Sequence, residues 1–414
     1  MDKIFSSDFF IQNRKSLQDS LGIDNPGVPL VVAAHGLLQR GADSTFPFHQ
    51  DSNFRYLTGI DEPDLILVMD SGNEYCIVPG RTGSREAFDG AVDKKHLSEI
   101  SGISEFVDEE EGWQRLGRRL KQTRKVYTLS APAAYIEQYG LYTNPARSRL
   151  VERLTTWQPE CEVLDIREHL IGMRMVKQPE ELKAVQKAID ITIRGINKVS
   201  ASLKKDGYEY EFEIENELAA AFRTKVASGH AFTPIVAGGK RACTLHNVQN
   251  NGKLQSGELI VIDVGAEVDH YAADITRTVA LGQPSGRQRQ VHEAVLDVQK
   301  QALSLLKPGT LLKEYEGQVE KIMGTKLQEL GLIKEADHDS VRRYYPHATS
   351  HFLGLDVHDV GDYMRPLEPG MVLTCEPGIY IPEEGIGVRI EDDILITESG
   401  HIVLSEKLPR QLTA

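Results

Sequence analysis

The chain has 414 residues, too many for one ordinary hydrophobic core, and a soft prior of about 150 residues per domain predicts two or three domains. Its formal net charge is −14. A surface that binds phosphate groups needs clustered Lys and Arg, so nucleic acid and an anionic membrane surface are not expected as partners. Hydrophobic residues make up 40% and charged residues 26%, a balance typical of soluble globular proteins.

The sequence favours a cytoplasmic protein. No apolar run approaches the ~20 residues that span a bilayer, and the start of the chain lacks the apolar stretch of a signal peptide. The cysteines lie far apart and form no CxxC pair, which argues against a disulfide framework and a thiolate zinc site. They are Cys76, Cys161, Cys243 and Cys375.

The first part of the chain alternates strand and helix signals, judged by the period of its apolar residues. The sequence SGNE at 71–74 is typical of a hairpin turn between the second and third strands. These signals predict an α/β domain with a mixed sheet over residues 1–173. The strands are predicted at 28–34, 64–69, 74–79, 125–129 and 162–166, and the helices near 6–20, 84–100, 112–122 and 145–156.

A different pattern begins near Arg174, where we place the domain boundary. Pro179 suits the first position of a helix, and the two acidic residues after it suit a helix N-terminus. Apolar residues then recur on one helical face through Ile196. Helix pairs interleaved with hairpins predict an α+β fold for residues 174–414. Further helices are predicted near 209–227, 286–306 and 312–330.

Two acidic residues stand inside the apolar, β-branched segment GELIVIDVGAEVDHYAADITRTVAL. They are Asp263 and Asp274. An antiparallel hairpin that turns at Val268–Asp269 would place these carboxylates opposite each other, with Cβ atoms about 5 Å apart. Like charges at that distance are destabilising unless a cation lies between them. We therefore favour a metal site over the alternative, in which one Asp caps a turn and the other is solvated.

Three of the 13 histidines fall within the segment HATSHFLGLDVHDVG: His347, His351 and His358. The first two are four residues apart, but residue 348 is Ala, so this is not the HExxH helix of zinc proteases. Taken alone, each histidine is more often a hydrogen-bonded structural residue than a metal ligand. The cluster makes one metal ligand with proton-handling neighbours about as plausible as the structural alternative.

A third segment, GMVLTCEPGIYIPEEGIGVRIEDDILIT, contains Glu376 at the end of an apolar run and Glu391 before another. Strand alternation places Arg389 and Glu391 on one face, where the guanidinium can orient a ligating carboxylate. A surface salt bridge on an exposed strand is the alternative. Cys375 is expected to point away from Glu376 and into the core.

These three segments supply four carboxylates and one imidazole. Two cations can share such a set through bridging carboxylates. Oxygen-rich ligands favour hard ions, so we expect Mn²⁺, with Co²⁺, Zn²⁺ or Fe²⁺ as alternatives. Such a pair, about 3.5–4 Å apart, would make a nucleophilic hydroxide from water and bind both ends of the reacting group. The candidate ligands are Asp263, Asp274, His351, Glu376 and Glu391.

Together the motifs resemble the pita-bread metallopeptidases, the family of methionine aminopeptidase, aminopeptidase P and prolidase. The resemblance covers roughly residues 176–414, where VIDVGAEVDHYAADITRT, SHFLGLDVHDVG, EPGIYIP and VRIEDDILIT occur in the family's order and near its spacing. It implies a C-terminal pita-bread catalytic domain, and it implies that all five candidate residues are metal ligands.

The resemblance also implies roles for the residues around the metals. His246 matches a histidine on the leaving-group side of the substrate, and His358 matches one that stabilises the tetrahedral intermediate. His347 matches a further active-site histidine. Glu376 would be both a ligand and the proton acceptor for a bridging water, and Arg389 matches an arginine that supports the ligands.

The segment FPFHQDSNFRYLTGIDEPD resembles the additional N-terminal domain of aminopeptidase P and some prolidases, which methionine aminopeptidase lacks. The resemblance therefore implies an Xaa-Pro aminopeptidase, which uses a metal-bridging hydroxide to hydrolyse peptides with proline at the second position. It also implies a homo-oligomer, either a dimer or a tetramer. Two features depart from the family pattern. Phe232 stands where a Tyr is expected, and the loop at 361–370 is shorter than in bacterial aminopeptidase P.

Three alternatives are compatible with the same fold. A prolidase would be restricted to Xaa-Pro dipeptides, and Arg365 in the shortened loop is a candidate to bind the dipeptide's carboxylate. Creatinase-like C–N hydrolysis is disfavoured because creatinase works without metal, whereas the ligand set is complete here. A non-catalytic binding protein is disfavoured because such proteins typically lose ligands.

Overall fold

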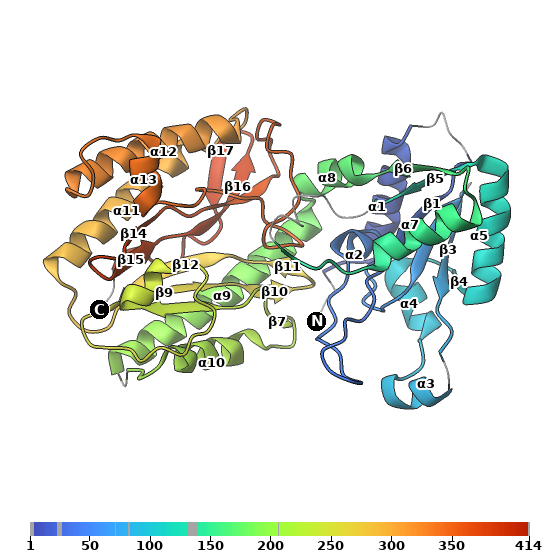
Figure 1. The fold of residues 1–414 in the computed structure, drawn as a ribbon, viewed down its shortest axis with the longest axis horizontal. Coiled ribbons are helices and arrows are strands. Elements are labelled where there is room, and N and C mark those ends of the chain that lie inside the picture. Colours follow the sequence, from blue (N-terminus) through green and yellow to red (C-terminus); the bar gives the residue numbers. More distant parts are fainter. Residues whose placement is uncertain are drawn as a thin grey trace. The chain divides into compact units, whose positions relative to one another are not determined.

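The computed structural model describes residues 4–22, 27–70, 72–81, 83–130, 140–205 and 207–412. Contacts divide the chain into two compact units, Met1–Met173 and Arg174–Ala414, which are taken in turn below. Both combine helices with strands, as the sequence predicts (Figure 1). Among the described residues, no helix has the length and apolar character needed to cross a membrane.

The N-terminal unit is built on a six-stranded sheet in the order β4-β3-β2-β1-β5-β6 (Figure 1). The pairs β1–β2 and β2–β3 are antiparallel, whereas β1–β5, β5–β6 and β3–β4 are parallel, which confirms the predicted mixed sheet. The strands are β1 (Leu30–Ala33), β2 (Ile66–Asp70), β3 (Asn73–Val78), β4 (Glu105–Asp108), β5 (Lys125–Thr128) and β6 (Glu162–Asp165).

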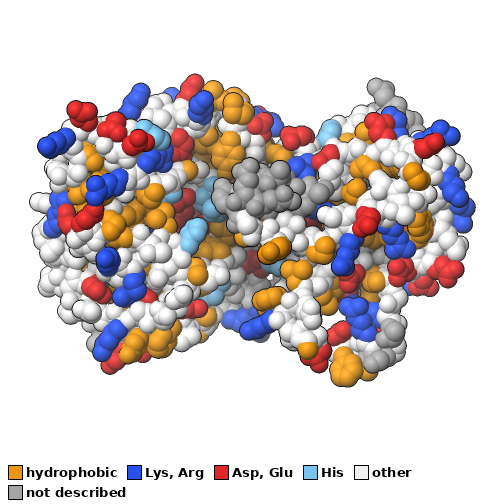
Figure 2. All heavy atoms as spheres, in the orientation of Figure 1, with side chains coloured by type: hydrophobic (Ala, Val, Ile, Leu, Met, Phe, Trp, Pro, Cys, Tyr) orange, Lys and Arg blue, Asp and Glu red, His pale blue; other side chains and the backbone are white. Residues whose placement is uncertain are grey.

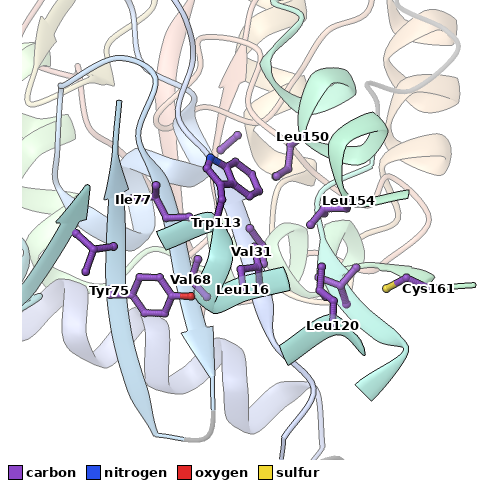
Figure 3. Packing of buried hydrophobic residues seen from close by; sticks show 13 residues of the cluster. Val31, Val68, Tyr75, Ile77, Trp113, Leu116, Leu120, Leu150, Leu154 and Cys161 are labelled. Atoms are coloured by element: carbon purple, nitrogen blue, oxygen red, sulfur yellow. The ribbon is translucent and has the colours of Figure 1, made fainter. Parts of the chain in front are cut away.

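Helices α5 and α7 cover one face of this sheet. Alternation along the strands turns Val31, Val68 and Ile77 toward this face, where they meet Trp113 of α5 and Leu150 of α7 (Figure 3). Helix α1 packs against α2 and α4. The helices of the unit are α1 (Ser7–Ser20), α2 (Ser52–Thr58), α3 (Gly83–Asp89), α4 (Lys94–Ser101), α5 (Glu109–Thr123), α7 (Ala146–Trp157) and α8 (Arg167–Met175).

The predicted helix at 84–100 is wrong as a single element, because α3 and α4 divide it. Gly90 adopts the left-handed conformation (φ 80°) after α3, and the side chain of Asp93 caps α4 by accepting a hydrogen bond from the backbone N–H of His96. Strand β4 and helices α2 and α8 were not predicted. The predicted hairpin between β2 and β3 is confirmed, with Asp70 paired to Asn73, although Ser71 of its turn lies outside the described residues.

The C-terminal unit places helices over several small antiparallel sheets (Figure 1). Helix α9 begins at Pro179, as predicted, and packs with α10, while α11 packs with α12. Helix α10 ends at Phe222, short of the predicted 227. The helices are α9 (Pro179–Lys205), α10 (Glu211–Phe222), α11 (Gly286–Leu305), α12 (Leu312–Glu329) and α13 (His338–Tyr344).

Three sheets and a hairpin carry the strands of this unit, in the orders β12-β9-β8, β11-β10-β7, β13-β16-β17 and β14-β15. The strands are β7 (Gly229–His230), β8 (Ile235–Gly238), β9 (Leu259–Val264), β10 (Ala266–Val268), β11 (Tyr271–Ala272), β12 (Ile275–Ala280), β13 (Val372–Cys375), β14 (Gly378–Ile381), β15 (Ile386–Arg389), β16 (Asp392–Thr397) and β17 (Gly400–Val403).

The predicted turn of the central hairpin at Val268–Asp269 is wrong by one residue. The turn is Asp269–His270, and both residues adopt positive φ angles (50° and 70°), as a type I′ turn requires. Asp263 consequently pairs with Thr276 rather than with Asp274. Because this error changes the pairing by two positions, Asp263 and Asp274 stay on one face of the hairpin as diagonal neighbours.

The ladder of this hairpin is interrupted between β9 and β10, at Gly265. A Cβ added at Gly265 would lie 1.6 Å from the Ala273 carbonyl oxygen, so no other residue fits without moving the backbone. On the opposite strand, the backbone N–H of Asp274 donates to Asp393 Oδ2 at 3.2 Å. The break therefore frees Asp274 from the ladder and aims it at the carboxylates described below.

We predict that Gly265→Ala destabilises the C-terminal unit by roughly 3 kcal/mol, at the upper end of overpacking costs. Its melting temperature, measured by calorimetry, should fall by about 6 °C or more. Gly317→Ala in α12 is the matched control, since its added Cβ meets no atom within 4 Å. That control should gain about 0.5–1 kcal/mol from helix propensity. Equal stability of the two variants would contradict this account of the break.

Candidate metal centre

The five predicted ligands converge on one cavity of about 740 Å³ within the C-terminal unit. Asp263 lies in β9, and Asp274 lies directly before β12. His351 lies in the segment between α13 and β13. Glu376 directly follows β13, and Glu391 lies in the connection between β15 and β16. Histidine and acidic side chains of this unit gather in a hollow of its surface (Figure 2). The other predicted site residues, His246, His347, His358 and Arg389, also line the cavity.

The ligand atoms lie close enough to share cations. Asp274, His351 and Glu391 each offer an atom within 4.8 Å of the others. His351 Nε2 lies 3.6 Å from Asp274 Oδ2 and 3.5 Å from Glu376 Oε1. Asp263, Asp274 and Glu391 are buried, and 17% of the Glu376 side chain is exposed.

Burial and mutual repulsion disfavour the charged form of these carboxyl groups. Burial, followed by the charge of Asp263, raises the pKa of Asp274 to about 6. Burial raises the pKa of Glu376 to about 7, with Asp274 adding to the shift and His351 opposing it. The pKa of Glu391 is raised well above its usual value by burial and then by Asp274. Without a cation, the cluster can be buried only if it takes up protons.

Two oxygens of the cluster test whether a metal fits. Within the described part of the chain, Asp263 Oδ1 and Asp274 Oδ1 are buried and accept no hydrogen bond. Buried carboxylate oxygens are normally paired, hydrogen-bonded or bound to metal, because each otherwise loses its solvation without replacement. A set of four carboxylates and one imidazole suits a hard or borderline divalent cation. The residues present therefore fit a metal centre.

Arg389 links two of the predicted ligands. Its Nη2 donates to Asp263 Oδ2 at 2.5 Å, and its Nε donates to Thr276 Oγ1 at 3.1 Å. The Thr276 hydroxyl in turn donates to Glu391 Oε2 at 2.6 Å. These bonds fix the orientation of both carboxylates. Strand alternation predicted that Arg389 orients Glu391, whereas Arg389 contacts Asp263 directly and reaches Glu391 only through Thr276. Arg389 is 4% exposed, so water does not screen this network.

Thr276 and Tyr380 also belong to this site, although neither was predicted from the sequence. Thr276 is a polar residue in the buried strand β12, two positions from Asp274 and on the same face, and this alternation is a usable signal. Tyr380 Oη accepts from Arg389 Nη1 at 2.8 Å. Its role depends on the pairing of β14 with β15, which no local pattern reveals.

Burial disfavours the charged form of the histidines beside the ligands. His347 Nδ1 lies 2.8 Å from the Ala348 carbonyl oxygen and donates to it, so its Nε2 accepts from Tyr380 Oη at 2.9 Å. Burial, aided by the charge of Arg389, lowers the pKa of His347 to about 3. Burial also lowers the pKa of His358 to about 4. Its ring packs against that of His351, with centroids 4.1 Å apart and an interplanar angle of 33°.

Cys375 lies in the core, as predicted, although it is adjacent to Glu376. Its side chain is fully buried, and its Sγ lies 3.5 Å from Tyr315 Oη. Burial raises the pKa of this thiol above its usual range. It therefore contributes no thiolate to the site.

We predict that Mn²⁺ added to the chelator-treated protein raises its melting temperature. A free ion at a hundredfold excess over Kd stabilises the fold by about 2.7 kcal/mol per site, which corresponds to at least about 5 °C. Glu391→Gln, which keeps the size of the side chain, should lose most of this shift. Glu398→Gln is the control, since Glu398 is an exposed carboxylate outside the cluster. A full Mn²⁺ shift in Glu391→Gln would show that the cluster is not the binding site.

Comparison with known proteins matches both units to described families. The model of metallopeptidase family M24 matches residues 183–398, and that of the aminopeptidase P N-terminal domain matches residues 10–127. The Xaa-Pro aminopeptidase of Haemophilus influenzae is 35% identical over 416 residues, covering 94% of this chain and 92% of that protein. The Xaa-Pro aminopeptidase of Escherichia coli is 33% identical over 441 residues, covering 98% and 96%.

Solved structures agree with these matches. The zinc-substituted aminopeptidase P of E. coli, solved in complex with product, superposes with a TM-score of 0.84 at 32% identity, covering 98% of this chain and 96% of that one. The expected pita-bread catalytic domain and the N-terminal domain resembling aminopeptidase P are confirmed, as is the expectation of a hydrolase that binds divalent metal. The chain therefore belongs to metallopeptidase family M24, with an aminopeptidase P N-terminal domain preceding the peptidase domain.

Proposed function

We propose that this chain is an Xaa-Pro aminopeptidase, which removes the N-terminal residue from peptides that have proline at the second position. The observation that carries the proposal is the convergence of five ligand side chains with His246, His347 and His358 on one cavity. The similarity to Xaa-Pro aminopeptidases, which extends over more than nine-tenths of the chain, supports the same reaction and substrate class.

Two divalent cations per chain would be held by the carboxylates and the imidazole of this cluster. Manganese is our proposal, because oxygen donors outnumber nitrogen donors, with cobalt, zinc or iron as alternatives. When bound, such ions supply Lewis acidity, which makes water a nucleophile at neutral pH and polarises the scissile carbonyl. The ligands are Asp263, Asp274, His351, Glu376 and Glu391.

The chain's own residues would handle protons and orient the substrate. Glu376 would accept the proton of the attacking water, since its carboxyl group lines the cavity and is partly exposed there. His358 lines the cavity, where a ring N–H would donate a hydrogen bond to the developing oxyanion. His246 would contact the leaving-group side. Arg389 would keep the Asp263 carboxylate oriented.

The substrate class follows from the chemistry of proline. The amide nitrogen of an Xaa-Pro bond carries no hydrogen. A peptidase that recognises its substrate through a hydrogen bond from this N–H therefore cannot bind an Xaa-Pro peptide in that way. A shaped cavity that accepts the pyrrolidine ring avoids this requirement. The cavity combines the polar ligands with the apolar side chains of Phe232, Ile235 and Leu245, which suits a ring beside a reactive carbonyl.

The prolidase alternative requires a cation that binds the carboxylate of a dipeptide. The candidate in the shortened loop, Arg365, instead donates to both oxygens of Glu368, at 2.7 and 2.8 Å, and does not line the cavity. This pairing favours an aminopeptidase that leaves the direction beyond proline open.

We also propose that Met1–Met173 and Arg174–Ala414 are the two domains, supported by family matches that fall within each unit. A cytoplasmic homo-oligomer, dimer or tetramer, stays a prediction based on the sequence.

We predict that His358→Ala keeps its metal but loses turnover on Ala-Pro-Ala by about 10²–10³-fold, the usual cost of removing one oxyanion donor. The measurements are kcat and the metal content of the same preparation. Near-normal kcat in the metal-loaded variant would show that His358 has only a structural role.

We also predict that Ala-Pro-Ala is cleaved with a higher kcat/KM than Ala-Pro under identical Mn²⁺ loading, because Arg365 is already paired. Arg365→Ala should leave the tripeptide's kcat/KM nearly unchanged. A tenfold preference for the dipeptide, about 1.4 kcal/mol of transition-state binding, would identify a prolidase instead.

A further inference from the structure

The loop that carries His358 is anchored by the buried carboxylate of the next residue, Asp359. Its Oδ1 accepts a hydrogen bond from Arg174 Nη2, and its Oδ2 accepts one from Lys177 Nζ at 2.8 Å. All three side chains are only 1% exposed. Each oxygen of the carboxylate thus has its own cation, and Lys177 Nζ also donates to the Arg174 carbonyl oxygen at 2.6 Å.

The loop is folded tightly around this carboxylate. The backbone N–H of Asp359 donates to the Phe352 carbonyl oxygen at 2.9 Å, which closes the segment between them. Inside it, a Cβ added at Gly354 would lie 2.1 Å from Asp359 Oδ2 and 2.8 Å from Lys177 Nζ. The carboxylate and the ammonium therefore fill the interior of the loop, and its shape depends on their staying there.

The ring of His358 depends on this loop for its position. Within the described ranges, no protein group forms a hydrogen bond with either ring nitrogen of His358, unlike His347 and His351, whose Nδ1 atoms donate to carbonyl oxygens. The ring lies against that of His351, with centroids 4.1 Å apart and an interplanar angle of 33°. This arrangement leaves the ring nitrogens of His358 available to the substrate. The position of the ring therefore depends on the backbone of the loop.

We propose that Asp359, held by Arg174 and Lys177, is a positioning residue that fixes His358 in the cavity. The proposal rests on the proposed function, in which His358 contacts the reacting carbonyl. Displacing a contact of this kind by about 1 Å costs roughly 10²-fold in rate, so an anchor without substrate contact can govern turnover.

The same loop offers a matched control. Asp356 Oδ2 also accepts from Arg174 Nη2, at 2.9 Å, but its side chain is 40% exposed. Asp359→Asn and Asp356→Asn make the same chemical change to two partners of one arginine, and only the first removes the charge inside the loop. We expect Asp359→Asn to lower kcat on Ala-Pro-Ala by about tenfold to a hundredfold. Metal content and KM should change little, and Asp356→Asn should stay within about twofold of the wild type.

Measuring the effect of Asp359→Asn with and without His358 distinguishes a positioning role of Asp359 from a general loss of stability. In a His358→Ala background, Asp359→Asn should lower kcat by less than about twofold, since the ring that it positions is gone. An equal loss in both backgrounds would overturn the proposal. Lys177→Met, which leaves Arg174 to pair the carboxylate, provides the same test if Asp359→Asn does not fold.

A structural readout is independent of activity. A crystal structure of Asp359→Asn, or of Lys177→Met, should show the His358 ring displaced from its contact with the His351 ring, whereas Asp356→Asn should keep that contact. An undisplaced ring would overturn the proposal. If His358→Ala alone has near-normal turnover, the proposed role of His358 fails, while the position of the ring in the other variants still tests the anchor.

Discussion

Four carboxylates around one imidazole, three of them buried, impose the constraint on which the C-terminal unit depends. Removing one such charge from water is costly, and placing several together adds repulsion to that cost. Two observations on the described residues reflect this cost. The pKa values of Asp274 and Glu391 are raised, and Asp263 Oδ1 and Asp274 Oδ1 accept no hydrogen bond. A cation offsets both terms, so one binding event stabilises the fold and assembles the reactive centre.

The surrounding structure orients the carboxylates through hydrogen bonds. Arg389 and Thr276 form a chain from Asp263 to Glu391, and Gly265 permits the break that brings Asp274 into place. Tyr380 Oη donates a hydrogen bond to His347 Nε2. These contacts restrict the side chains before substrate arrives, which is how a site supplies orientation at little cost during reaction.

Local patterns explain why most of this could be predicted from the sequence. Asp263 and Asp274 stand out because charges are rare in apolar strands, and their common face survived the error in the turn since side chains alternate with a period of two. The start of α9 could be predicted because Pro179 is followed by two acidic residues, a pattern typical of a helix N-terminus. The N-terminal sheet followed from apolar periodicity, although β4 is too short to stand out.

What could not be predicted depends on contacts between distant segments. Tyr380 reaches Arg389 only because β14 and β15 pair. The anchor of His358 joins Asp359 to Arg174 and Lys177, which lie more than 180 positions earlier in the chain. Each of these charged residues, considered with its sequence neighbours alone, would be expected on the solvated surface. Only the fold shows that the side chains of all three residues are buried.

The proposed function depends on the binding of a pair of divalent cations by the carboxylate cluster. The most direct measurement is the anomalous difference density of crystals of the Mn²⁺-loaded protein, recorded at the manganese edge and compared with elemental analysis of the same preparation. The account predicts two peaks, both contacted by the ligand set, with Asp274, His351 and Glu391 among the contacting side chains. A single peak, or peaks away from these side chains with two equivalents of Mn²⁺ present, would contradict it.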